Sequence, residues 1–225
     1  MYTNQIRYNA LGYHPMIDYR NKEFHNNLNL IKPILQSITN NTTRALDLGC
    51  NAGKYSFMLE EIGAKVTGVD YAESTIKIAR EIANELNSSC TFLVENILDM
   101  SFNDNSFDIA IFPLNIIEFS YEEVDKLCRE LKKVLADEGV FCITMEDGLN
   151  RIVCGMDSAD KYQGTNGIHT AVQNIPEKGS YEYRTYFWTI AFAKHIIAQH
   201  FMFSKEIKLS DNKYYIEFRN VIELT

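Results

Sequence analysis

The residues best suited to hold a ligand lie in one short segment, ALDLGCNAGK, residues 45–54. Gly49 and Gly53 lie four residues apart between an apolar run and a segment with helical spacing, which predicts a strand, a tight turn and a helix. A helix N-terminus favours anions, yet Asp47 at the mouth of the turn would repel one. A ligand with both an ammonium and a carboxylate resolves this conflict, because Asp47 can accept from the ammonium while backbone N–H groups bind the carboxylate.

A second acid points to the rest of this ligand. Asp70 ends the apolar segment KVTGVD about 20 residues further on, the distance at which an acid reaches ribose hydroxyls. An amino acid joined to a nucleoside describes S-adenosylmethionine. The competing ligand is a nicotinamide dinucleotide, whose pyrophosphate requires Gly-x-Gly-x-x-Gly, and Gly49-Cys50-Asn51-Ala52-Gly53 lacks that spacing.

The elements that must position these residues alternate along the chain. Apolar runs predict strands at 44–47, 65–70, 91–95, 107–112 and 140–145, and helical spacing predicts helices at 23–39, 54–62, 73–86, 122–135 and 189–200. Ser120 and Glu123 form a capping-box pattern before the fourth of these helices. Strand–helix repetition with short links predicts a doubly wound α/β fold, and segments 203–209 and 213–224 predict an antiparallel hairpin at the end.

Four segments carry a family resemblance: ALDLGCNAG, KVTGVDYAES, VENILDMSFNDNSFDIAIF and LKKVLADEGVFCITMED. Together they resemble the class I S-adenosylmethionine-dependent methyltransferases over residues 44–147. The resemblance implies a Rossmann-like, mostly parallel seven-stranded sheet whose last strand is antiparallel. It also implies S-adenosylmethionine as the cofactor and S-adenosylhomocysteine as the product.

The family's glycine motif maps onto Asp47, Gly49, Asn51 and Gly53, and Asn51 replaces the middle glycine. Asparagine tolerates left-handed backbone better than other non-glycine residues, so the turn can survive and the Asn51 side chain is free to contact the cofactor. Asp99 is a further position that the resemblance brings toward the exocyclic amine of the adenine. The full set of implied cofactor contacts is Asp47, Gly49, Cys50, Asn51, Gly53, Asp70, Tyr71, Asn96, Ile97, Phe112 and Leu114.

The pattern divides the chain into four parts. We expect an N-terminal helical arm or cap at 1–40, the cofactor-binding core at 41–147, an insertion or lid at 148–188, and a C-terminal helix and hairpin at 189–225 that complete the same sheet. The acceptor pocket is expected between the arm, the loop after the fourth strand and the insertion. Candidate substrate contacts are Tyr13, Tyr19, Tyr186 and Trp188, and candidate catalytic residues are His14, Glu118 and His169. The alternating aromatic run YEYRTYFW is also typical of a strand packed against the core.

Charge and motifs narrow the acceptor class. The net charge of −8 and the pI near 5.2 disfavour nucleic acids and anionic membranes as partners. After the fourth strand the chain reads Phe112-Pro113-Leu114-Asn115, without the second proline of amino-methylating DNA enzymes, and no proline precedes a cysteine as in cytosine carbon-5 enzymes. We therefore expect methyl transfer to O or N of a small molecule, by in-line displacement.

The remaining expectations concern context. The five cysteines are scattered and form no CxxC pair, so we expect reduced thiols in a cytoplasmic protein, a monomer or homodimer without a zinc site or disulfides. Glu146 and Asp147 end the fifth strand but do not make a sufficient case for a metal. Two other functions stay open: a methyltransferase-like domain that binds without turnover, and, less favoured, an NAD(P)-binding oxidoreductase.

Overall fold

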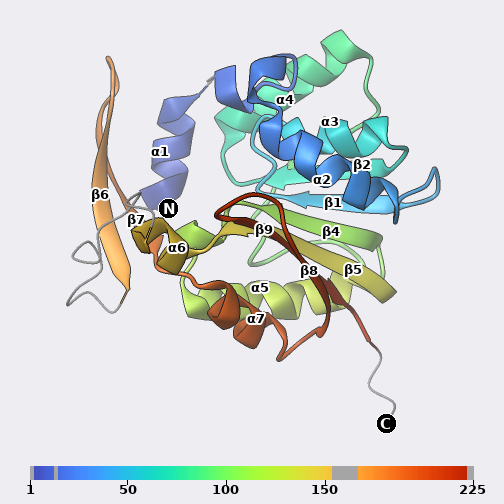
Figure 1. The fold of residues 1–225 in the computed structure, drawn as a ribbon. Coiled ribbons are helices and arrows are strands. Elements are labelled where there is room, and N and C mark those ends of the chain that lie inside the picture. The colour runs from blue at the N-terminus through green and yellow to red at the C-terminus, as the bar shows by residue number, and fades with distance from the viewer. Residues whose placement is uncertain (1–2, 13–14, 154–166, 222–225) are drawn as a thin grey trace.

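The computed structural model describes residues 3–12, 15–153 and 167–221. Its centre is a seven-stranded sheet with the strand order β3-β2-β1-β4-β5-β9-β8 (Figure 1). The strands are β1 (Arg44–Leu48), β2 (Lys65–Asp70), β3 (Thr91–Val94), β4 (Phe107–Pro113), β5 (Leu135–Glu146), β8 (Met202–Lys208) and β9 (Lys213–Arg219). Strands β1 to β5 pair in parallel, whereas β9 is antiparallel to both of its neighbours, β5 and β8. The expected doubly wound, mostly parallel α/β sheet is confirmed.

Helices cover both faces of the sheet (Figure 1). One face carries α2 (Asn26–Gln36), α3 (Lys54–Glu61) and α4 (Glu73–Leu86), and the other carries α5 (Tyr121–Val134) and α7 (Ile190–Ile197). Side chains alternate along β1, so Leu46 and Leu48 join the core beneath α5, while Ala45 joins the core beneath α3. Asp47 therefore points to the α3 side.

Two features of these helices can be read from their sequences. The capping box at α5 is confirmed, since Ser120 accepts from the Glu123 backbone and Glu123 accepts from the Ser120 backbone. Pro33 neither ends nor divides a helix, because α2 runs through it to Gln36. The apolar residues Leu28, Ile31 and Leu35 of α2 are buried against the sheet, which compensates for the hydrogen bond that proline removes.

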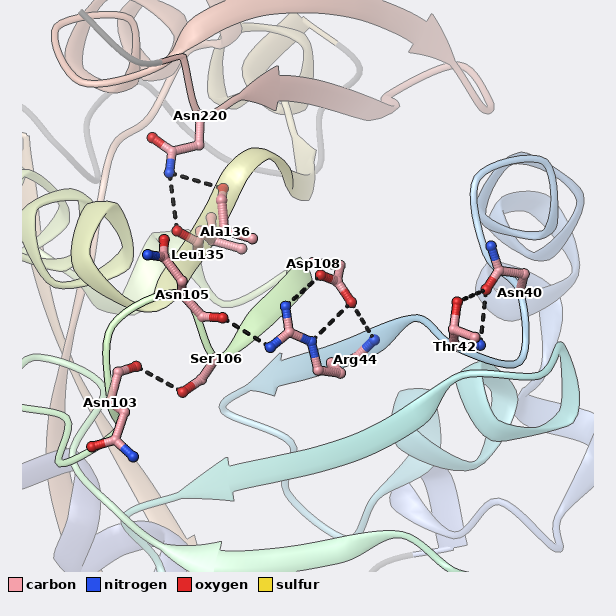
Figure 2. A network of polar contacts seen from close by, with 10 residues as sticks. All are labelled: Asn40, Thr42, Arg44, Asn103, Asn105, Ser106, Asp108, Leu135, Ala136 and Asn220. Atoms are coloured by element: carbon pink, nitrogen blue, oxygen red, sulfur yellow. Dashed lines mark hydrogen bonds and ion pairs between the residues drawn. The ribbon is translucent and has the colours of Figure 1, made fainter.

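The N-terminal ends of the central strands β1 and β4 are joined by an ion pair and hydrogen bonds between Arg44 and Asp108 (Figure 2). The Arg44 guanidinium donates to both carboxylate oxygens of Asp108, and the Arg44 backbone N–H donates to Asp108 Oδ2 at 2.8 Å. Its Nη1 also donates to the carbonyl of Asn105 at 2.9 Å. This network fixes the relative positions of β1 and β4, and so of the loops at their carboxyl ends.

The segment after β5 contains more regular structure than the sequence suggests. A short helix, α6 (Gly148–Val153), is followed after the undescribed residues by an antiparallel hairpin of β6 (Ile168–Ile175) and β7 (Gly179–Tyr186). The hairpin stands apart from the main sheet, beside α1 (Thr3–Leu11) (Figure 1). Three single-turn helices complete the described chain: η1 (Pro15–Ile17), η2 (Lys22–Phe24) and η3 (Ile116–Glu118). Within the described residues, no helix has the length and apolar character needed to cross a membrane.

Candidate functional site

The glycine turn lies at the carboxyl end of β1, in the middle of the sheet. Gly49 and Asn51 both adopt left-handed backbone, with φ of +66° and +52°. A Cβ atom at Gly49 would lie 2.6 Å from Nδ2 of Asn115, so a side chain at position 49 has neither the backbone conformation nor the space it needs. The turn is held from β4, because Asn115 Nδ2 donates to the carbonyls of Leu48 and Gly49, at 3.2 Å each.

Gly53 serves a different purpose from Gly49. It has φ of +83° at the start of α3, and a Cβ there would lie 2.6 Å from the ring of Phe92. The glycine therefore allows α3 to pack closely against the sheet. Cys50 is buried in the same core, its backbone N–H donates to the Val69 carbonyl and its own carbonyl accepts from Gly53. A cofactor contact through Cys50 or Gly53 stays a prediction, since neither lines the cavity described below.

Asp70 lies at the carboxyl end of β2, facing the glycine turn. Its Oδ2 accepts from the backbone N–H of Asn51 at 3.0 Å, and its Oδ1 accepts from that of Ala72 at 2.8 Å. Burial raises the pKa of this carboxyl to about 6, against the opposing effect of these two hydrogen bonds. Asp70 thus joins the turn after β1 to the turn after β2, as expected for neighbouring parallel strands.

Asp47 lies beneath the turn rather than beside a ligand. It is fully buried, its Oδ2 accepts from the Ser56 hydroxyl of α3 at 2.6 Å, and its Oδ1 has no hydrogen-bond partner. Burial raises its pKa to about 7. The expected contact between Asp47 and an ammonium stays a prediction, because Asp47 is not among the residues that line the cavity.

A cavity opens between these turns and the N-terminal helix. The wall formed by the predicted residues consists of Gly49, Asn51, Asp70, Tyr71 and Ile97, and the opposite wall consists of Tyr8, Asn115, Glu118 and Phe119. Glu118 Oε1 accepts from the Tyr8 hydroxyl at 2.5 Å and from Arg7 Nη2 at 2.7 Å. Of the candidate catalytic residues, Glu118 is therefore the one that the structure brings to the cavity, and His14 lies outside the described residues.

Other predicted cofactor contacts lie near the cavity without lining it. Asn96 forms the turn after β3, with its side chain accepting from the Leu98 N–H at 3.0 Å, and Asp99 is exposed. Phe112 is buried in the core against Phe119, with ring centroids 5.4 Å apart. Leu114 adopts φ of +60°, an uncommon backbone conformation for a bulky side chain, directly before Asn115.

The structure places two predicted substrate contacts, Trp188 and Tyr19, in the hydrophobic core. Trp188 is 1% exposed and belongs to the core beneath α5, where its Nε1 donates to the Phe119 carbonyl at 3.0 Å. Tyr19 is buried on the α3 side, with its ring tilted against that of Phe57 and its hydroxyl donating to Glu61. A substrate contact through Trp188 or Tyr19 stays a prediction, since neither lines the cavity described above.

The remaining acceptor candidates lie on the hairpin or outside the described chain. Tyr13 lies outside the described residues. Tyr186 of β7 is half-buried against the core beneath α5. His169 of β6 is half-buried and lies opposite Thr185 in the hairpin. It lies on the same face of the hairpin as Gln173 and Tyr183, and this face contacts α1 through Arg7.

Sequence reasoning missed Arg7, Tyr8 and Asn115 as site residues. Asn115 could have been predicted from the sequence, because it follows β4 and so lies at the same end of the parallel strands as the glycine turn. No pattern in the sequence connects Arg7 and Tyr8 with Glu118, because they lie 111 and 110 positions before it in the chain. In the part of the chain that the structure describes, no three His, Cys, Asp or Glu side chains are grouped so that they could hold a metal.

These residues fit S-adenosylmethionine. Gly49 and Asp70 both line the cavity, and Asp70 presents a carboxylate at the end of β2. The Asn51 Oδ1 atom is buried without a hydrogen-bond partner at the cavity, so it can accept from a polar group of the cofactor. The Gly-x-Gly-x-x-Gly pattern for a pyrophosphate is missing from the turn, which makes a dinucleotide the less favoured ligand.

Comparison with known proteins extends this result beyond the site. The model of the family described as "Methyltransferase domain" matches residues 39–203, more than half of the 225-residue chain. A sterol 4-C-methyltransferase, strm-1, of Caenorhabditis elegans is 32% identical over 102 residues, 44% of this chain and 29% of that protein. A demethylmenaquinone methyltransferase of Listeria welshimeri is 32% identical over 101 residues, 43% of this chain and 42% of that protein.

The matched region thus spans less than half the length of these curated relatives. A solved structure described as an S-adenosylmethionine-dependent methyltransferase of Methanosarcina mazei superposes with a TM-score of 0.72 at 22% identity, covering 85% of this chain and 98% of that one. This last likeness concerns the fold.

Proposed function

Because the chain belongs to the methyltransferase-domain family, we propose that it transfers a methyl group from S-adenosylmethionine to a small-molecule acceptor. The observation that carries the proposal is the cavity between the turns after β1 and β2, with Gly49, Asn51 and Asp70 on its wall. S-adenosylmethionine supplies an electrophilic methyl group on a sulfonium when it is bound. The residues of this chain then have to hold it, align the acceptor and exclude water.

Each wall residue has a proposed task. Asp70 accepts from the ribose hydroxyls, using the lone pairs left by the N–H groups of Asn51 and Ala72. Tyr71 and Ile97 lie against the adenine, and Asn51 Oδ1 accepts from the amino-acid part. Deprotonated Asp70 is the form that suits hydroxyl donors, so we expect the cofactor to favour its charged state.

The acceptor is proposed to be small, with transfer to O or N. The relatives named above act, by their names, on a sterol and on demethylmenaquinone, which supports a small-molecule acceptor. They do not support the choice of O or N, because the sterol enzyme is named for methylation at carbon. An acceptor that loses a proton on methylation needs a base, and Glu118 is the proposed group because its carboxylate lines the cavity at the end of η3. An acceptor that loses no proton would require only alignment.

Calorimetric titration with S-adenosylhomocysteine tests the cofactor assignment. We expect one site per chain, no binding of NAD(H), and affinity about tenfold weaker or worse in Asp70→Ala, because the loss of hydrogen bonds to a charged group costs ~1.5–3 kcal/mol. Binding of NAD(H) in preference would contradict the proposal. The unfolding temperature of Asp70→Ala must be measured alongside, since Asp70 also holds two backbone N–H groups.

Turnover requires a separate experiment. The protein would be incubated with methyl-labelled S-adenosylmethionine and two extracts, one of water-soluble metabolites and one of lipids, and labelled products would be identified by mass. A product that depends on the protein and disappears in Asp70→Ala supports methyl transfer. Tight binding of S-adenosylhomocysteine without any labelled product in either extract would instead support the binding-only alternative.

A further inference from the structure

Helix α1 contributes to the site without contributing to the core. None of its residues belongs to the two clusters of buried apolar side chains that hold the described part of the chain together. Its Ile6 is 42% exposed, whereas Arg7 is 7% exposed. The helix is therefore docked by polar contacts rather than by apolar burial, as is typical of elements that open locally at low cost.

One set of these contacts joins α1 to the cofactor side of the cavity. Gln5 Nε2 donates to the Tyr71 carbonyl at 2.8 Å, directly after Asp70. The backbone N–H of Ser74, in the first turn of α4, donates to Asn9 Oδ1 at 3.2 Å. The N-cap residue of α4 is Ala72, whose side chain cannot accept a hydrogen bond. Asn9 of α1 therefore supplies the side-chain acceptor for a free N–H group in the first turn of α4.

Arg7 joins α1 to the opposite side. Its Nη2 donates to Glu118 at 2.7 Å, and its Nη1 contacts Gln173 Oε1 of β6 at 3.5 Å. The guanidinium also lies 4.1 Å from the ring centroid of Tyr183 in β7 and 4.4 Å from that of Tyr8. A nearly buried guanidinium thus links three segments, α1, η3 and the hairpin, and its Nε has no hydrogen-bond partner.

The docked helix limits the size of the cavity. Tyr8 of α1 forms part of its wall, and the cavity volume is about 30 Å³. Sites for small molecules usually measure ~300–1,000 Å³, so a nucleoside with an amino-acid tail does not fit beneath the helix in this position. Because α1 belongs to neither core, its displacement would leave both cores intact.

We propose that α1 is a lid over the cofactor cavity and that Arg7 is the positioning residue that latches it to Glu118. This inference rests on the proposed function, because it takes S-adenosylmethionine as the ligand. Undocking of α1 admits the cofactor, whereas docking in the position described here closes the cavity to it. Arg7 acts through Glu118 and Tyr183 and contacts neither the cofactor nor the acceptor.

Hydrogen exchange followed by mass spectrometry tests the latch in the protein alone. We expect amides of residues 3–12 to exchange about tenfold faster in Arg7→Gln than in the natural sequence, because one partner of a nearly buried charge pair is lost. Arg7→Lys keeps the charge but not the planar fork, so it should restore part of the protection. Exchange in residues 3–12 that is the same in all three proteins would overturn the proposal.

Binding kinetics test the link to the cofactor. In Arg7→Gln we expect S-adenosylhomocysteine to associate about tenfold faster and to dissociate at an unchanged rate, because α1 closes the empty cavity for less of the time, with the unfolding temperature of the core unchanged. The matched control is Arg20→Gln, which removes ion pairs with Asp18 and Glu85 outside α1 and should change neither rate. Unchanged rates in Arg7→Gln would show that α1 does not gate the cavity.

The two experiments separate the inference from the function on which it rests. If the natural protein does not bind S-adenosylhomocysteine, the proposed function fails, while the exchange experiment still decides whether Arg7 latches α1. If Arg7→Gln does not fold, Gln5→Ala replaces it, because this variant removes the contact between α1 and the Tyr71 carbonyl. The expected results for hydrogen exchange and for both binding rates are the same as for Arg7→Gln.

Discussion

The Nδ2 atom of Asn115 lies 2.6 Å from the position that a Cβ atom on Gly49 would occupy. The same nitrogen donates to the Gly49 carbonyl, so the glycine turn after β1 and the loop after β4 are fitted to each other. This contact joins the predicted cofactor turn to the segment that bears Glu118.

Gly49→Ala should destabilise the protein by about 2 kcal/mol or more, from left-handed backbone strain of ~1–2 kcal/mol and the clash with Asn115. Chemical unfolding measures the loss. Gly179→Ala is the matched control, because Gly179 has φ of +105° but no atom within 4 Å of its Cβ position. Adding Asn115→Ala to Gly49→Ala should recover part of the loss, and equal losses in Gly49→Ala and Gly179→Ala would contradict the role of the contact.

Asn51→Gly should separate the backbone role of Asn51 from its side-chain role. Glycine adopts φ of +52° without strain, so stability should change by less than ~0.5 kcal/mol, while affinity for S-adenosylhomocysteine should fall about tenfold because Oδ1 is lost. Calorimetry measures the affinity. Asn105→Gly, at φ of +57° near the opposite edge of the sheet, is the control and should leave affinity unchanged. Full affinity in Asn51→Gly would mean that Oδ1 does not contact the ligand.

Asp47 should make the stability of the ligand-free protein depend on pH. Its pKa is raised from 3.8 to about 7 on folding, so the folded state binds a proton that the unfolded state has released. Its contribution is present in full below about pH 4 and declines as pH rises to about 7, by at most ~1.4 kcal/mol per pH unit. The difference in unfolding free energy between the natural protein and Asp47→Asn should therefore decrease between pH 5 and pH 7 and level off above. A constant difference across this range would show that Asp47 is charged throughout.

Trp188→Phe tests whether this side chain only packs in the core or also contacts the acceptor. The substitution leaves a gap beside Tyr121 and Phe192 and removes the hydrogen bond to Phe119, which should cost about 2 kcal/mol of stability. Circular dichroism suits the measurement, because the sole tryptophan is lost. Once an acceptor is known, its KM should be unchanged. A raised KM at unchanged stability would return Trp188 to the acceptor pocket.

The sequence predicted the central fold because each signal there is local. Strand β4 is an apolar run bounded by polar turns, and α5 begins with Ser120 and Glu123 in capping-box spacing. Gly49, Asn51, Asp70, Tyr71 and Ile97 line one cavity because parallel strands bring the turns that follow them to the same end of the sheet. The family prediction is confirmed by the matched family model over residues 39–203.

The opposite wall of the cavity could not be found in this way. The ion pair between Arg7 and Glu118 joins residues 111 positions apart, and no periodicity relates α1 to η3. The run YEYRTYFW fits a strand and an acceptor pocket equally well in sequence, and only tertiary packing places Trp188 in the core and Tyr183 against Arg7. Residues 148–180 carry many turn-forming side chains, which concealed the hairpin of β6 and β7.

The position of β9 in the sheet has a consequence for biosynthesis. Strand β5 pairs with β4 on one side and β9 on the other, and β9 comprises residues 213–219, which leave the ribosome after the rest of the sheet has been made. Until then the nascent chain presents β5 as a long apolar edge that can pair with other chains. Proteolytic loss of β9 would create the same aggregation-prone edge in the folded protein.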